Sequence, residues 1–260
     1  MIKKLFSKVG GAAASTGKKH AGTNQLNDAA RLTLNNAFLD QYKHENDPQS
    51  VFDLCKTFAD QGSDEALYLL GVLYEKGDGQ KTYSKQAADS YWLAAKAGKP
   101  EAQYNLGLMC AQGLINEPDM LSAIHWFELA STAGIKEATY NLATCYDQGL
   151  GCLADKKKAY SLFQIAGEQG FVRAWHNVAV MLYLGEGVGK DLVAAYARLL
   201  LAAKAGLQDS IDMEPSLSAE LNAEQILEGK TQLDALMTQF ASLLPTKQSA
   251  AKPSAQFYTP

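Results

Sequence analysis

The residue spacing of this chain repeats every 36 positions through its centre. One position of the period holds alanine in four consecutive copies, and Leu or Val follows it four residues later. Glycine recurs at two further positions of each copy. The members are Ala66, Ala102, Ala138 and Ala174; Leu70, Leu106, Leu142 and Val178; Gly77, Gly113, Gly149 and Gly185; and Gly98, Gly134, Gly170 and Gly206. A period of about 20 to 50 residues is typical of proteins built from stacked supersecondary units.

Each copy of the period predicts two helices, because its apolar and small residues recur at steps of three and four and no strand-like alternation interrupts them. In the second copy the first helix, here named helix A, is expected over residues 101–111 and should end at Gly113. Gly107 lies within this helix, where it costs roughly 1 kcal/mol relative to Ala. We therefore expect Gly107, like Gly71, Ala143 and Ala179 at the same position, to permit close approach of a neighbouring helix.

The second helix of each copy, helix B, carries a small, a large and a small side chain on one face, at spacings of four and three. A helix pair this short cannot bury both of its apolar faces, so neighbouring pairs must stack on one another. The sequence therefore predicts an all-α, curved α/α solenoid. The triplets are Ala87/Tyr91/Ala94, Ala123/Phe127/Ala130, Ala159/Phe163/Ala166 and Ala195/Leu199/Ala202.

The segments outside the period are expected to cap the solenoid. Two helices predicted over residues 26–45 and 48–60 form a divergent N-terminal pair, and Asn222 can cap a C-terminal helix from Ala223 to about Leu243. The expected organisation is a flexible basic segment (1–25), an N-terminal capping pair (26–62), four repeats (63–98, 99–134, 135–170 and 171–206), a C-terminal capping helical segment (207–245) and a flexible tail (246–260).

Charge is distributed unevenly along the chain. The net charge is −4, but residues 1–25 hold five lysines and no acid, so the remaining residues carry −9. An acidic folded region argues against nucleic acid as a ligand. The first residues lack the hydrophobic stretch of a secretory signal, no stretch is long and apolar enough for a membrane span, and we expect a cytoplasmic protein of a bacterium. A second interpretation of residues 1–20 is peripheral contact with an anionic membrane, through a short amphipathic turn.

No residue pattern indicates a catalytic, cofactor or metal site. The four cysteines (Cys55, Cys110, Cys145 and Cys152) and the four histidines (His20, His44, His125 and His176) lack metal-ligand spacing. Cys145 and Cys152 could pair under oxidation, but reduced thiols in apolar positions are the simpler interpretation. Residues 184–191 contain three glycines and a lysine, yet lack the first glycine and the Ser or Thr of a phosphate-binding loop, so they predict a turn between helices.

The residues Glu101-Ala-Gln-Tyr-Asn-Leu-Gly-Leu-Met and the turn at Gly185-Glu-Gly-Val-Gly-Lys-Asp resemble the Sel-one-like repeat, a relative of the tetratricopeptide repeat with a longer turn. The resemblance covers residues 63–206 and implies a right-handed superhelix that serves as a protein-binding scaffold. It supplies no catalytic residue. One branch of the family has a cysteine pair in every unit, which this sequence lacks.

The tetratricopeptide relationship implies that helix A lines the concave face, which is where we expect a protein or peptide partner to bind. Aromatic side chains with a polar edge suit such a surface, although the same residues could serve packing between repeats. Trp92 and Trp126, on helix B, are candidates for a second, convex contact, whereas Trp175 is expected to pack. The expected partner-binding residues are Tyr68, Tyr104, Tyr140 and His176; Glu75, Asp147 and Tyr183; and Asn105, Asn141 and Asn177.

Three functional hypotheses are favoured by the sequence, and an enzyme is a remote fourth because no acid, base and nucleophile coincide on one predicted face. The first is a non-enzymatic adaptor that captures a protein segment on its concave surface. The second is an inhibitor or immunity protein that neutralises one enzyme or toxin, and the third is a membrane-associated organiser that acts through the basic N-terminal segment.

Overall fold

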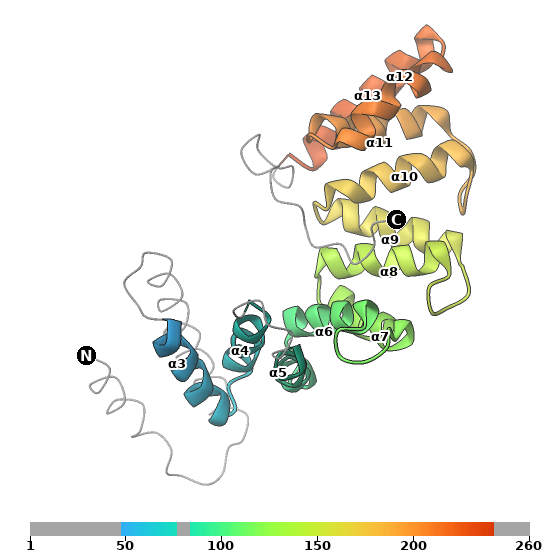
Figure 1. Cartoon of the computed structure of the whole chain (residues 1–260). Coiled ribbons are helices and arrows are strands. Elements are labelled where there is room, and N and C mark those ends of the chain that lie inside the picture. The colour runs from blue at the N-terminus through green and yellow to red at the C-terminus, as the bar shows by residue number, and fades with distance from the viewer. Residues whose placement is uncertain (1–47, 77–83, 242–260) are drawn as a thin grey trace, which may run out of the picture. The chain divides into compact units, whose positions relative to one another are not determined.

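The computed structural model describes residues 48–76 and 84–241, and every regular element within them is a helix, as predicted (Figure 1). The chain divides into two compact units, Met1–Gly79 and Gln80–Pro260. The predicted helix over residues 26–45 and the tail over residues 246–260 lie outside the described residues. None of the helices within the described ranges is both long and apolar enough to cross a bilayer.

The described part of the first unit is a helix pair. It consists of α3 (Pro48–Asp60), at the predicted position, and α4 (Asp64–Lys76). Val51, Cys55 and Phe58 of α3 form an apolar core with Ala66 and Leu70 of α4. This is the arrangement expected of a capping helix followed by the first helix A.

The second unit is a stack of helices in which A and B alternate. The first predicted repeat, residues 63–98, is divided between the units, because its helix A is α4 and its helix B is α5. The helices are α5 (Ser84–Lys96), α6 (Pro100–Gln112), α7 (Met120–Thr132), α8 (Lys136–Gln148), α9 (Lys156–Glu168), α10 (Val172–Leu184), α11 (Leu192–Lys204), α12 (Gln208–Ala219) and α13 (Ala223–Gln239). Each helix A (α6, α8 and α10) packs against the helix B that follows it and the helix B that precedes it.

The small–large–small triplets of helix B form the core of this stack. All twelve of their side chains are at most 1% exposed. Gly107 of α6 faces Phe127 of α7 so closely that a β-carbon at Gly107 would lie 2.7 Å from Cε1 of the phenylalanine ring. The expectation that Gly107 permits close helix approach is confirmed, and the neighbour is helix B of the same repeat.

The turn between helix A and helix B has the same polar framework in three repeats. Asp119, Asp155 and Asp191 each precede helix B and accept a hydrogen bond from a backbone N–H in its first turn, over 2.9–3.0 Å. Their own backbone N–H groups donate to the end of the preceding helix A, to the carbonyls of Cys110, Tyr146 and Leu182. Helix A ends at Gly113, Gly149 and Gly185 in the left-handed conformation, as expected. The capping aspartates were not recognised in the sequence, although they recur every 36 residues.

The C-terminal cap differs from the predicted single helix. The sequence indicated one helix from Ala223 to about Leu243; the structure has α12 before it, and α13 ends at Gln239. α12 is in phase with the repeats, because Ser210, fully buried, occupies the position of Ala174. α13 begins at the predicted cap, Asn222, which forms a capping box with Gln225, but the helix leaves the period and packs against α11.

We expect Gly107→Ala to destabilise the second unit by about 1–3 kcal/mol, because the new β-carbon must displace the buried ring of Phe127. Urea unfolding followed by circular dichroism would measure this change. The matched control is Gly189→Ala, where a β-carbon meets nothing within 4 Å, and where a change within about 0.5 kcal/mol is expected. Equal stabilities of the two variants would contradict the assigned role of Gly107.

Candidate partner-binding face

The residues predicted to bind a partner lie on the helices A of both units. In the second unit Tyr104, Tyr140 and His176 occupy the same position of α6, α8 and α10, and all three are half-buried. Asp147 and Tyr183 follow on α8 and α10, seven residues after the aromatic position, and are also half-buried. We name the helix A face as these five residues with Asn105, Asn141 and Asn177. Tyr68, half-buried, and Glu75, exposed, lie on α4 of the first unit.

Tyr140 connects the third repeat to the fourth. Its ring lies 4.7 Å from the ring of Phe171 and 5.4 Å from that of Phe163, between centroids. Its hydroxyl accepts a hydrogen bond from Nδ2 of Asn177, over 3.3 Å. Burial raises the pKa of Tyr140, and the hydrogen bond from Asn177 partly opposes that rise. The tyrosine ring therefore packs against both its own repeat and the start of the next, and its hydroxyl bonds to helix A of the next.

Tyr104 repeats the ring packing of Tyr140 one unit earlier. Its ring centroid lies 6.2 Å from that of Phe127, which belongs to helix B of the same repeat. Burial raises the pKa of Tyr104, as does the nearby charge of Glu137, whereas the side chain of Asn141 on the next helix A lowers it. Asn141 is only 3% exposed. Asn177 therefore connects two successive helices A, whereas the buried Nδ2 of Asn141 makes no hydrogen bond within the described residues.

His176 occupies the tyrosine position of the last repeat and makes a different connection. Its Nδ1 lies 2.9 Å from Oγ of Ser210 on α12. Burial lowers the pKa of His176, and Arg173 also lowers it, whereas Asp209 raises it. Arg173 and Asp209 themselves form an ion pair at 3.8 Å. His176 therefore joins the last full repeat to the C-terminal cap.

A charged rim follows the row of Asp147 and Tyr183. Lys156, in the first turn of α9, contacts Asp147 at 2.8 Å and Glu186 of the next repeat at 3.0 Å. The hydrogen bond to Asp147 is the main cause of the raised pKa of Lys156. On the next helix A the hydroxyl of Tyr183 donates to Glu220 over 2.6 Å. The ammonium of Lys190 lies 5.1 Å from the centroid of the Tyr183 ring.

Lys156, Glu186 and Glu220 contribute to this rim and were not predicted from the sequence. Lys156 gives only a weak signal in the sequence, because the same position holds Ser84, Met120 and Leu192 in the other repeats. Glu220 lies beyond the four repeats and carries no such signal.

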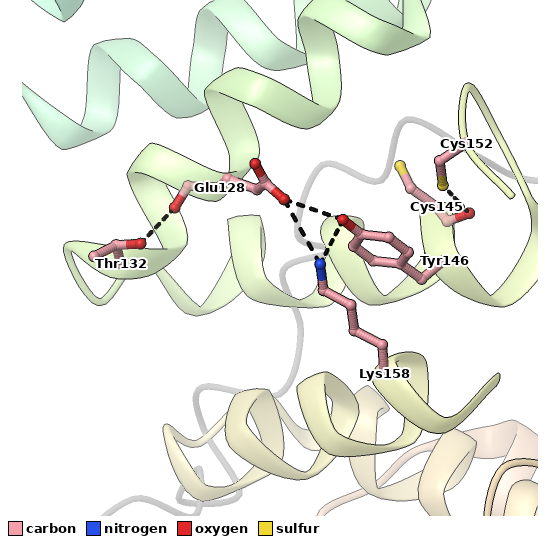
Figure 2. Close-up of polar contacts among 6 residues, drawn as sticks. All are labelled: Glu128, Thr132, Cys145, Tyr146, Cys152 and Lys158. Carbon is pink, nitrogen blue, oxygen red and sulfur yellow. Dashed lines mark hydrogen bonds and ion pairs between the residues drawn. The ribbon is translucent and has the colours of Figure 1, made fainter. Parts of the chain in front are cut away.

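A second polar cluster lies between the second and third repeats (Figure 2). The hydroxyl of Tyr146 lies 3.1 Å from Oε1 of Glu128 and receives a hydrogen bond from Lys158 over 2.6 Å. The ammonium of Lys158 also lies 3.8 Å from the centre of the Tyr146 ring. Glu128 belongs to helix B of one repeat, and Tyr146 and Lys158 to the two helices of the next. This cluster therefore stabilises the junction of two repeats.

The cysteines of the described residues are free thiols. Burial raises the pKa of Cys145 to about 12, so it remains a protonated thiol at neutral pH. Cys152, on the turn after α8, directs its thiol to the carbonyl of Cys145 rather than to its sulfur, over 3.6 Å (Figure 2). Cys110 and Cys145 were both expected at apolar positions; Cys110 is half-buried and Cys145 is buried.

The glycine-rich turn, the three tryptophans and His125, which the sequence also raised as candidates, all lie in the second unit. Residues 185–191 form the turn from α10 to α11, with Gly185 ending one helix and Asp191 capping the next. Trp175 is buried, Trp92 is 45% exposed and Trp126 is half-buried. His125 is exposed, and no group of three or more His, Cys, Asp or Glu side chains within the described residues has the arrangement of a metal site.

Together the helices define a class of protein, the α/α helical repeat proteins with a 36-residue helix pair. The model of the Sel1 repeat matches residues 64–98, 100–135, 136–171 and 173–207, which is more than half of the chain. The chain belongs to the Sel1 repeat family, the family that its sequence resembles. Proteins with Sel1 repeats generally mediate protein–protein interactions, and the family is typically non-catalytic.

Two solved structures are similar to the chain. One is a protective antigen present in uropathogenic Escherichia coli strains that displays an SLR fold; it is 25% identical with a TM-score of 0.71, over 86% of this chain and 48% of that chain. The other is a Sel1 repeat protein from Oxalobacter formigenes, 28% identical with a TM-score of 0.60, over 66% of this chain and 50% of that chain. The match thus spans about half the length of each solved relative. No curated protein matches the sequence.

We expect Tyr140→Phe to destabilise the second unit by about 0.5–1 kcal/mol, because the amide of Asn177 loses its hydrogen-bond acceptor while the ring packing is kept. Urea unfolding would measure the loss. In a double-mutant cycle with Asn177→Ala, the second substitution should cost less when Tyr140 is already Phe. Strict additivity would show that the two residues do not interact.

The stability of the second unit should fall as the pH decreases below about 6.5, the ordinary pKa of histidine, in part because of His176. The pKa of His176 is lower in the folded state, so the unfolded state takes up a proton first as the pH falls. The contribution of His176 to the free energy of unfolding is therefore present above pH 6.5 and lost below it. Urea unfolding at pH 7.5 and pH 5.5 would compare the wild type with His176→Gln. Identical pH dependence in the two proteins would contradict this assignment.

Proposed function

We propose that the chain is a non-enzymatic adaptor that binds a segment of a partner protein on its helix A face. The observation that supports the proposal most directly is the connection of successive helices A through the side chains of that face. Tyr140 with Asn177, and His176 with Ser210, join the three helices α8, α10 and α12 in series. A surface whose side chains are already ordered loses little conformational entropy when a partner binds.

The partner that suits this face is a protein segment carrying both apolar and charged side chains. Leu108, Thr144 and Val180 lie one helical turn after the aromatic row and are half-buried, so they offer apolar contact. The rim beside them presents acids and bases in alternation, including Asp147, Lys156 and Glu186. Mixed charges at the edge of an apolar surface favour a specific orientation of the bound segment rather than indiscriminate binding.

The test uses Thr144→Glu/Val180→Glu, which places two charges on the helix A face without removing a tyrosine that packs between repeats. Cross-linking and affinity capture from a lysate of the source cell should recover a partner with the wild type and lose at least nine tenths of it with this variant. Circular dichroism would establish that the variant is folded. Ile165→Glu, on an exposed position of α9, is the matched control and should retain the partner.

Retention of every partner by Thr144→Glu/Val180→Glu would contradict binding at this face. The identity of a captured protein would also decide among the roles raised by the sequence. A captured enzyme or toxin that the chain inhibits would favour an inhibitor or immunity protein. Dependence of recovery on residues 1–20 and on the membrane fraction would favour a membrane organiser over a cytoplasmic adaptor.

A further inference from the structure

The helices α6, α8, α10 and α12 each carry a charged residue at their second position. These residues are Glu101, Glu137, Arg173 and Asp209, spaced 36 positions apart. Glu101 forms an ion pair with Lys99 at 3.4 Å, and Arg173 forms one with Asp209 at 3.8 Å. Glu137 is half-buried, yet its carboxylate makes no hydrogen bond or ion pair with any residue that the structure describes. The row therefore has one carboxylate whose counter-charge the described chain does not supply.

A second polar group without a partner lies next to this carboxylate. Asn141 is four positions after Glu137 on α8, so the two side chains share one face of the helix. Asn141 is 3% exposed, and its Nδ2 lacks a hydrogen-bond acceptor within the described residues. Besides burial, which raises the pKa of Tyr104 most, the charge of Glu137 raises that pKa and the side chain of Asn141 lowers it, so both groups lie near the tyrosine. We name Glu137, Asn141 and Tyr104 the Glu137 site.

One repeat later the same three positions are occupied by Tyr140, Arg173 and Asn177. The amide of Asn177 donates to the hydroxyl of Tyr140, and the guanidinium of Arg173 is paired with Asp209. This later set of side chains is therefore completed within the chain. The Glu137 site holds the corresponding positions of α6 and α8, but its carboxylate and its amide have no partner in the described chain.

Leaving both groups of the Glu137 site unpaired opposes folding. A half-buried carboxylate loses part of its hydration without gaining a counter-charge, and a buried amide without an acceptor retains the cost of its desolvation. The N-terminus of a helix favours an acid in its first turn, which accounts for the carboxylate but not for the unpaired amide. Residues that are unfavourable for stability in this way are typical of functional sites.

We propose that the Glu137 site binds an arginine of the partner segment, with the guanidinium on the carboxylate of Glu137 and a carbonyl oxygen of the same segment accepting from Asn141. A guanidinium suits this site because it donates two parallel hydrogen bonds to a carboxylate and stacks on an aromatic ring such as that of Tyr104. A lysine ammonium supplies the charge without this planar geometry. The inference rests on the proposed function, since the arginine belongs to the segment bound at the helix A face.

The probe is the peptide acetyl-Ala-Arg-Ala-amide, and its control is the same peptide with citrulline, which keeps the shape of arginine and lacks its charge. NMR of the isotope-labelled full chain should show saturable shifts at the backbone amides of residues 137–141 and at the side-chain amide of Asn141. The citrulline peptide should bind at least fivefold more weakly, because it offers no charge to Glu137. Absence of saturable shifts at these residues, or equal binding of the two peptides, would overturn the proposal.

Two substitutions separate binding from a structural role. Glu137→Gln should weaken binding of the arginine peptide at least fivefold, whereas Glu168→Gln, the same change at an exposed position of α9, should alter it less than twofold. Asn141→Leu should also weaken binding, while its midpoint of urea unfolding equals or exceeds that of the wild type, because an apolar side chain of similar size replaces an unpaired amide. Undiminished binding by Glu137→Gln would contradict the site. A lower unfolding midpoint with unchanged binding would contradict the role of Asn141.

Affinity capture from the source-cell lysate separates this inference from the proposed function. Glu137→Arg, which introduces the residue that α10 carries at the same position, should lose the partner as Thr144→Glu/Val180→Glu does. Retention of the partner by Glu137→Arg, with its loss by Thr144→Glu/Val180→Glu, would overturn the arginine site and leave the adaptor function standing. Retention by both variants would overturn both.

Discussion

The contact between a small residue of helix A and a large side chain of its own helix B sets the geometry of the repeat pairs in the second unit. Gly107 leaves space for the ring of Phe127, and Ala143 and Phe163 are both buried at the same positions one repeat later. Each helix of a pair is thirteen residues long. Two such helices packed closely together are too short to bury both apolar faces of the pair. Stacking on the next pair is therefore a requirement of the fold.

Polar side chains align the repeats within this apolar stack. Tyr140 and Asn177 connect two helices A, and the cluster of Glu128, Tyr146 and Lys158 connects two repeats at the junction of α7, α8 and α9. Apolar packing alone is tolerant of small rotations, whereas hydrogen bonds restrict distance and angle. The residues expected to contact a partner are thus also residues that set the position of one repeat relative to the next.

The repeat period made most of the fold predictable, since a position that stays small, large or glycine in four copies has one structural reason in all of them. The period could not predict the role of a residue that makes its contact in one repeat only. Lys156 bridges two carboxylates in one repeat alone, and the rim to which it belongs was not predicted. α12 was missed because polar residues and Pro215 obscure its apolar pattern, although Ser210 keeps the spacing of the alanines. The capping aspartates Asp119, Asp155 and Asp191 recur in three of the four repeats and were not predicted, because their position is neither apolar nor glycine.

The C-terminal cap limits how such an array can grow. α12 keeps the phase of the repeats, whereas α13 departs from it and covers the outer face of α11. A further 36-residue unit added after α12 would have to supply its own helix B and would separate α13 from α12. A duplication of one internal unit, for example residues 135–170, would leave α11, α12 and α13 together. Lengthening of this array by gene duplication is therefore expected to occur within it, with the terminal helices inherited unchanged.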